Sequence, residues 1–257
     1  MDVHAPHAGI HTWKDFWIHL GTITIGLLIA IGLEQSVEWM HRLHEKHALQ
    51  HDLREEARHN MNIISGDIHI ENSVTWMQNA ATAADSAQTN GNGSSGGKVT
   101  LTLATAPCFA GTLNSMVVKY FAPSEAVWTA ARESGTTVLI PASEARVYER
   151  LAHNLALLSG ARDRVAAACN EVAADQQRLS VAGSVAGTRV WTMTPERAEK
   201  FSEAASRAGI EIKALVFRLR VVQVCEEAIL NEALDSDKIM EMIGKVEEES
   251  TSDAAKP

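Results

Sequence analysis

Four histidines lie in one short stretch of the chain, at His41, His44, His47 and His51. Spacings of three, three and four residues place them on one side of a helix. Neutral imidazoles at such spacings can share a divalent metal ion, and protonated ones would add positive charge beside a membrane. The row therefore has three interpretations: polar surface, a metal site, or a pH-sensing surface. Polar surface is the commonest role of such a row on a solvated helix.

The other residues that could do chemistry do not form a known catalytic set. The sequence contains no HExxH pattern of zinc chemistry, and its GxSxG and SxxK matches, at residues 93–97 and 95–98, both fall in a glycine- and serine-rich run without the strand–turn–helix context of a catalytic nucleophile. The Glu-x-x-His pattern of di-iron bundles is needed on two helices. It occurs here at Glu38/His41 and at Glu56/His59, which belong to the same predicted helical stretch. Glu227 and Asn231, four residues apart, could line a bundle interior, where burial raises the pKa of a glutamate. We expect no enzymatic activity and no cofactor.

An uncharged apolar stretch precedes the histidines, from Phe16 to Leu33. As a helix it would be about 27 Å long, close to the hydrocarbon thickness of a bilayer. Trp17 and Trp39 lie near its ends, as interfacial aromatic residues do. A buried core helix rarely excludes charge so completely, and a cleaved signal peptide would carry more basic residues than Lys14 before it. The lipid bilayer is therefore the first predicted partner.

Small residues recur along this anchor, at Thr22, Gly26 and Ala30. Spaced by four residues, they form a stripe that lets a second membrane helix approach closely, so a homo-oligomer through the anchor helix is an open alternative. The orientation is weakly determined, because basic residues are nearly balanced on the two sides of the anchor. Their count leans slightly towards a cytoplasmic C-terminal part.

The composition favours helices and excludes one class of partner. The 257 residues carry a formal net charge of -9 without a long Lys/Arg cluster, so nucleic-acid binding is not expected. Alanine is abundant and proline is rare, which favours helix. Cys108, Cys169 and Cys225 lack the spacing of a metal site, and we expect three buried free thiols. A single disulfide is the alternative if the domain faces an oxidising space.

The patterning divides the chain into an anchor, helices and breaks. Apolar residues from Leu43 to Ile68 recur at helical spacing, and those from Val147 to Val172 do the same. The run TNGNGSSGGK predicts a flexible break and SVAGSVAGTR a glycine-containing loop, while KVTLTLATAP could form a lone strand. The predicted segments are a short N-terminal part (1–15), a transmembrane anchor (16–39), a membrane-proximal long helix (40–88), a flexible break (89–107), a helical-bundle domain (108–248) and a disordered tail (249–257).

Two segments resemble a group of uncharacterised bacterial single-pass membrane proteins. The first, HTWKDFWIHLGTITIGLLIAIGLEQSVEWMHRLHEKHALQHDLREEARHN, joins an apolar helix to a polar one with a Leu-x-x-Glu-x-x-x-Asn pattern, here Leu53, Glu56 and Asn60. The second, VWTAARESGTTVLIPASEARVYERL, is similar through Trp128, Gly135 and Tyr148. The resemblance implies a membrane-anchored helical domain of unknown role in the bacterial cytoplasmic (inner) membrane. It also implies that the domain lies outside the cytoplasm, whereas the count of basic residues beside the anchor slightly favours a cytoplasmic domain.

The sequence therefore predicts an all-α fold in which an N-terminal transmembrane helix continues into a helical bundle. We expect a membrane-anchored scaffold or accessory protein that acts by binding other proteins. A sensor-like bundle that binds a ligand is one alternative. A metal-binding protein that uses His41, His44, His47 and His51 is the other.

Overall fold

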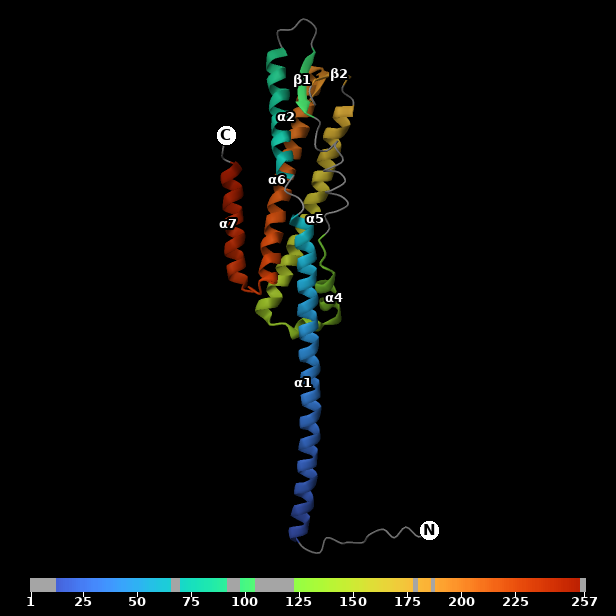
Figure 1. Ribbon diagram of the computed structural model, residues 1–257, viewed down its shortest axis with the longest axis vertical. Helices are drawn as coiled ribbons and strands as arrows, with labels where there is room; N and C mark the ends of the chain where they lie inside the picture. Colours follow the sequence, from blue (N-terminus) through green and yellow to red (C-terminus); the bar gives the residue numbers. More distant parts are fainter. Residues whose placement is uncertain are drawn as a thin grey trace, which may run out of the picture. The chain divides into compact units, whose positions relative to one another are not determined.

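The computed structural model describes residues 13–65, 70–91, 98–104, 123–177, 180–185 and 188–254. Helices dominate, which confirms the predicted all-α class (Figure 1). The elements are α1 (Trp13–Ser65), α2 (Ile70–Gly91), β1 (Val99–Ala104), α4 (Ala126–Ser134), the 3-10 helix η2 (Thr136–Leu139), α5 (Ala142–Gln177), β2 (Ser180–Val185), β3 (Thr188–Met193), α6 (Pro195–Leu230) and α7 (Ser236–Ala254). The chain divides into two units, Met1–Gln50 and His51–Pro257.

The described part of the first unit consists of helix α1. An 18-residue window of this helix has a mean hydropathy of 2.0, and none of it is buried. The helix is therefore long and apolar enough to cross a membrane, and its apolar part is not a core helix of this chain. The hydroxyl of Thr22 donates to the carbonyl oxygen of Ile18 at 2.9 Å, so the polar side chain is satisfied within the helix.

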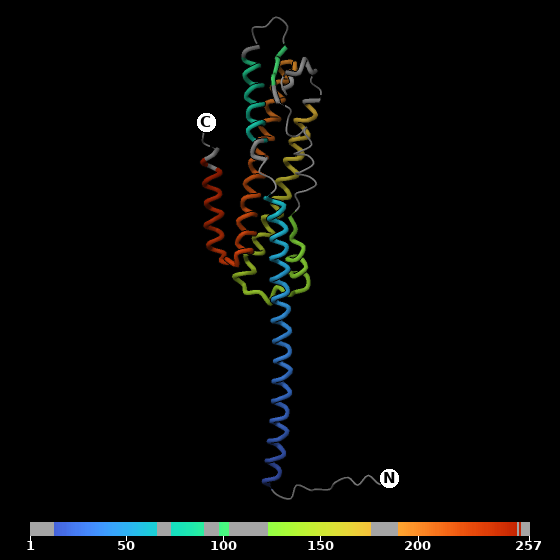
Figure 2. Tube along the Cα trace, in the orientation of Figure 1, coloured from blue at the N-terminus to red at the C-terminus, as the bar shows by residue number. Residues whose placement is uncertain are grey.

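The core of the second unit lies between α2, α5 and α6. Figures 1 and 2 show these three helices side by side, and the packing of α2 and of α5 against α6 is extensive. Small residues let the helices approach closely: Ala80 and Ala84 on α2 and Ala208 on α6 are fully buried. At Gly209 an added Cβ would lie 3.4 Å from Cβ of Met77 on α2. The high alanine content thus serves close helix packing as well as helix propensity.

A three-stranded antiparallel sheet covers part of this core, with strand order β1-β3-β2. Leu101 on β1 pairs with Trp191 on β3, and both side chains are buried in the core. Thr100 and Thr102, between and beside the buried positions of β1, are exposed, which is the period of two that a half-buried strand requires. The prediction that residues 180–189 form a loop is wrong, because β2 and β3 in this segment pair with each other and give β1 its partner.

Several predicted boundaries also differ from the structure. The membrane-proximal helix predicted over 40–88 is divided, since α1 ends at Ser65 and α2 begins at Ile70. The break predicted over 89–107 contains β1, and residues 92–97 lie outside the described residues. The tail predicted from 249 begins too early, because α7 continues to Ala254.

The cysteines do not match the prediction of three free thiols. Cys169 on α5 is disulfide-bonded, whereas Cys225 on α6 is free and buried. Burial raises the pKa of the Cys225 thiol to about 12, so this thiol stays protonated and unreactive in the folded state. Cys108 lies outside the described residues.

Candidate functional site

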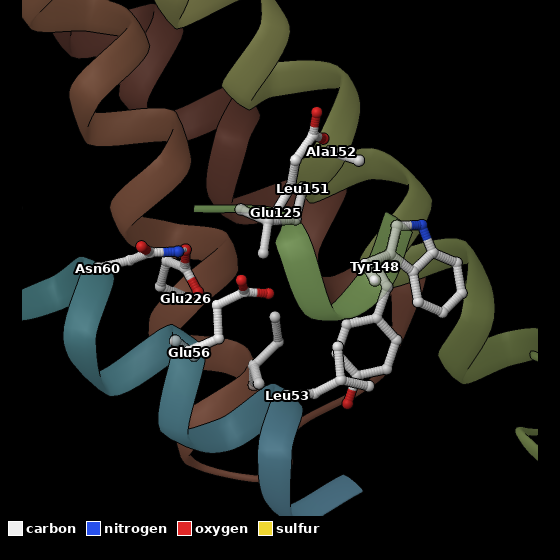
Figure 3. A pocket seen from close by; sticks show the side chains of 11 residues that line it. Leu53, Glu56, Asn60, Glu125, Tyr148, Leu151, Ala152 and Glu226 are labelled. Carbon is white, nitrogen blue, oxygen red and sulfur yellow. Dashed lines mark hydrogen bonds between the residues drawn. The ribbon is translucent and has the colours of Figure 1, made fainter. Parts of the chain in front are cut away.

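A polar cluster is buried where α1 meets α4 and α6 in the second unit. Asn60 of α1 and Glu226 of α6 are both completely buried, and the amide Nδ2 of Asn60 donates to Oε1 of Glu226 at 2.7 Å. The same amide group pairs with the backbone of Ser124: Nδ2 donates to the carbonyl oxygen at 2.9 Å, and Oδ1 accepts from the backbone N–H at 2.7 Å. Asn60 therefore joins three segments that are far apart in the sequence. Figure 3 shows its side chain beside that of Glu226.

Glu56, one turn before Asn60, caps the start of α4. Its Oε1 accepts from the hydroxyl of Ser124 at 2.7 Å and from the backbone N–H of Val127 at 3.2 Å. The Ser124 hydroxyl in turn accepts from the backbone N–H of Ala126 at 3.1 Å. A carboxylate at a helix N-terminus satisfies free N–H groups and interacts favourably with the helix dipole. The first turn of α4 is thus held by a side chain of α1, because Glu125 at the N-cap makes no side-chain cap.

Glu226 has the unusual electrostatic environment of the cluster. Burial raises the pKa of its carboxyl from 4.5 to about 8, while the hydrogen bond from Asn60 lowers it and the charge of Glu56 raises it. Its Oε2 has no hydrogen-bond partner among the described residues. A carboxyl in this position is mostly protonated at neutral pH, and it gains a buried negative charge only when the pH rises further.

Two aromatic residues close the other side of the cluster. Trp128 of α4 and Tyr148 of α5 are stacked, with ring centroids 5.2 Å apart and an interplanar angle of 28°. Both are buried, and the Tyr148 hydroxyl donates to Oε1 of Glu144 at 3.4 Å. Burial raises the pKa of Tyr148 well above its ordinary value, so it remains a neutral donor. Gly135, with φ of 77°, ends α4 in the left-handed region and lets the chain turn into η2.

The cavity enclosed by this cluster is small. It measures about 10 Å³ and is lined by Glu56, Asn60, Trp128, Tyr148 and Glu226 among others. A single water molecule needs roughly 10–15 Å³ in this measure, so the cavity has no room for an organic ligand. The arrangement can exchange a proton at Glu226 and can hold α1, α4 and α6 together, but it does not form a ligand pocket.

The structure does not gather the predicted histidines into a metal site. His41, His44, His47 and His51 are all exposed on α1. Nε2 of His41 lies 3.0 Å from Oε1 of Glu45, and Nδ1 of His51 lies 3.3 Å from Oδ1 of Asp52. Over the described residues, no group of three or more His, Cys, Asp or Glu side chains could hold a metal ion. A metal site on this row would therefore need ligands from outside the described part of one chain.

The predicted anchor residues lie on the exposed first part of α1. Gly26 has no atom within 4 Å of an added Cβ, so none of the described residues covers this position of the small-residue stripe. Thr22 and Ala30 lie on the same apolar stretch, and Trp17 and Trp39 are 55% and 65% exposed near its two ends. Trp17 also makes an edge contact with Phe16, at a centroid separation of 5.8 Å.

Sequence reasoning named part of the buried cluster and missed the rest. Leu53, Glu56, Asn60, Trp128 and Tyr148, which carry the predicted family resemblance, all line the one cavity. The expected buried glutamate was Glu227, but that residue is exposed and accepts from Gln223 at 2.8 Å, and its neighbour Glu226 is the buried one. A signal was present: Glu226 continues the apolar spacing of Leu219, Val222 and Ile229 along α6.

Comparisons with protein-family models, with curated proteins and with solved structures found no match to this chain. The resemblance to single-pass bacterial membrane proteins therefore stays a prediction. The evidence for function comes from the physical properties of the chain itself: an exposed apolar helical stretch in the first unit, and a helical core with a buried polar cluster in the second.

Proposed function

We propose that this protein is a membrane-anchored helical scaffold or accessory protein that acts by binding other proteins. The observation that carries the proposal is the composition of α1. One unbroken helix contains an exposed apolar window long enough to span a bilayer and, further on, the side chains Glu56 and Asn60 that enter the polar cluster of the second unit. Membrane attachment and domain structure therefore reside in the same element.

The character of the core supports binding by a surface rather than by a pocket. The cavity beside Glu226 has room for one water molecule at most, so the buried cluster itself does not support a sensor-like function. Exposed apolar side chains occur instead on α1 after the apolar window, at Val37, Trp39 and Met40. Surfaces of this kind are typical of sites that contact lipid or protein. Enzymatic activity and nucleic-acid binding are not part of the proposal.

We further propose that the domain faces an oxidising space outside the cytoplasm, with the anchor in the bacterial cytoplasmic membrane. The disulfide at Cys169 supports this orientation, because disulfides persist outside the cytoplasm and are rare in the reducing cytosol. The nearly balanced basic residues beside the anchor oppose this orientation only slightly.

The proposal is tested by membrane extraction and by a topology reporter. Wild-type protein should stay with membranes after an alkaline wash, whereas a variant with Leu27→Arg and Ile29→Arg should be released, since arginine at a helix centre costs roughly 3 kcal/mol on insertion scales. Leu27→Ala with Ile29→Ala is the matched control and should stay in the membrane. A reporter at the C-terminus that works only outside the cytoplasm should be active. Retention of the double-arginine variant would contradict the anchor, and an inactive reporter would contradict the orientation.

A further inference from the structure

One face of α1 keeps a heptad spacing across the end of the apolar window. Ala30, Leu33, Val37, Met40, His44 and His47 follow one another at spacings of three and four residues in strict alternation, as the core positions of a coiled coil do. We call these six residues the α1 seam. Gly26 and Ile23 continue the same spacing towards the N-terminus, so the repeat extends over more than three heptads.

The seam has no partner within the described chain. Leu33, Val37 and Met40 are 63%, 67% and 63% exposed, and both histidines are exposed. The α1 residues that enter the core of the second unit, Leu53 and Ala57, belong to another face of the helix. The seam is therefore an unpartnered surface, distinct from the surface by which α1 packs in its own domain.

The apolar part of the seam extends past the hydrocarbon core of the membrane, to the level of the interfacial Trp39. Met40 lies seven residues after Leu33, which corresponds to about 10 Å along a helix. Lipid acyl chains that cover Leu33 therefore do not cover Met40, and a largely exposed methionine there favours association with another apolar surface.

The charges on α1 indicate which kind of partner surface the α1 seam can bind. The positions that flank the seam on one side, Ile29, Ser36 and Leu43, carry no charge. Glu34 and His41 flank the seam on its other side, and the nearby charges pair within the helix: Arg42 donates to Glu38, and His41 contacts Glu45 at 3.0 Å. The seam residues Leu33, Val37 and Met40 are themselves uncharged, so this surface complements an apolar helix.

A second copy of this chain meets these conditions. All copies of a single-pass protein insert with the same orientation, so two α1 helices in one membrane are parallel and can align in register. Each seam residue then faces the same residue of the other copy, so that apolar side chains pack against apolar side chains. Gly26 and Ala30 would allow the close approach within the hydrocarbon region, where small residues favour helix contact.

We infer that two copies of the protein pair in parallel along the α1 seam, and that two histidine layers at its end make this pairing weaker at acidic pH. The inference rests on the proposed membrane anchor, which aligns the copies. In such a pair His44 faces His44 and His47 faces His47, which brings four imidazoles together. Histidines gain a proton below about pH 6.5, and four like charges at close range oppose association.

The surrounding charges only partly offset this effect. On the same helix the groups nearest to the histidine layers are His41, Glu45, Lys46 and His51. Glu45 is already in contact with His41, and Lys46 adds a further positive charge. Protonation of the layers therefore increases the repulsion between the two helices.

Cysteine cross-linking in native membranes tests the inference. Val37→Cys and Met40→Cys place thiols in the seam, and Glu38→Cys and Arg42→Cys place them on the outer face of the same helix as matched controls. Under mild oxidation at pH 7.5, the two seam variants should form disulfide-linked dimers several-fold more than the two controls. The unsubstituted chain, with Cys225 buried and Cys169 already bonded, sets the background.

The pH effect is tested by comparing Val37→Cys with a variant that also carries His44→Gln and His47→Gln. At pH 5.5 the dimer fraction should be several-fold higher with glutamines than with histidines, and at pH 7.5 the two should agree. Equal cross-linking at seam and control positions in membrane-inserted protein would overturn the interface, and equal yields at pH 5.5 would overturn the role of the histidines. Release by an alkaline wash would instead identify a failure of the anchor, and the inference would fall with it.

Discussion

The substitution Glu226→Gln tests the electrostatics of the buried cluster directly. Glutamine keeps the shape of the side chain and can still accept the hydrogen bond from Asn60 at Oε1. It imitates the protonated carboxyl and cannot take up a negative charge. Any difference between variant and wild type that changes with pH therefore reports the ionisation of Glu226.

The size of the effect follows from the pKa of this carboxyl. Burial raises it from 4.5 to about 8, so the folded protein binds the proton more tightly than the unfolded chain does between these two pH values. Folding stability should then be highest below pH 4.5, fall as the pH rises towards 8, and become level above it. Each pH unit corresponds to about 1.36 kcal/mol, so the total loss is at most about 5 kcal/mol.

The assay is equilibrium unfolding of the full-length protein in detergent micelles, followed by circular dichroism between pH 5 and 9. Wild type and Glu226→Gln should have similar free energies of unfolding at pH 5, and the variant should be the more stable protein above pH 8. Glu227→Gln, at an exposed neighbouring position, is the matched control and should follow the wild type at every pH. Parallel pH profiles for wild type and Glu226→Gln would refute the reasoning, because they would mean that Glu226 is already ionised in the folded state.

Three further predictions concern the packing of the second unit. Asn60→Leu should lower the free energy of unfolding by about 3 kcal/mol, because it leaves polar groups of Ser124 and Glu226 without a hydrogen-bond partner. The control Asn62→Leu, at an exposed position, should change it by less than about 0.5 kcal/mol. Equal effects of the two substitutions in urea titrations would contradict the structural role of the cluster. Gly135→Ala should lower the free energy of unfolding by about 1 kcal/mol, because the φ of 77° at this position is unfavourable for alanine. Gly160→Ala, within helix α5, should raise the free energy of unfolding by a similar amount. An increase for both variants would exclude backbone strain at position 135. The buried Cys225 thiol, whose pKa is raised to about 12, should react with maleimide only in denaturant, and fast labelling of the native protein would show that it is accessible.

The helices were predictable because each carries local signals. Gly135 ends α4 in the αL conformation that glycine favours, and α6 begins at Pro195, a residue type common at the first position of a helix. The hairpin of β2 and β3 was not predictable in this way. Its glycines suggested a loop, and the pairing of β3 with β1 joins segments nearly ninety residues apart, which no local pattern shows.

Only part of the buried cluster could be predicted from the sequence, for a related reason. Glu56 and Asn60 follow each other on one helix and could be noted as a pattern, but their partners Ser124 and Glu226 lie on other elements. The apolar spacing along α6 does mark Glu226, rather than Glu227, as the glutamate on the buried face. Its pairing with Asn60, however, depends on how α6 packs against α1, which no local pattern shows.

The cluster also explains how α1 keeps one position in its domain. Its buried apolar residues, Leu53, Ala57 and Ile64, repeat at spacings of about one and two turns, so apolar packing alone would tolerate a shift of the helix by one turn. Asn60 does not tolerate it, because its amide would lose all three hydrogen bonds and remain buried without partners. Each such unsatisfied group costs about 1–3 kcal/mol, which is large against the small apolar area that α1 buries. The polar side chains therefore fix the register of the one helix that both carries the apolar window and enters the domain core.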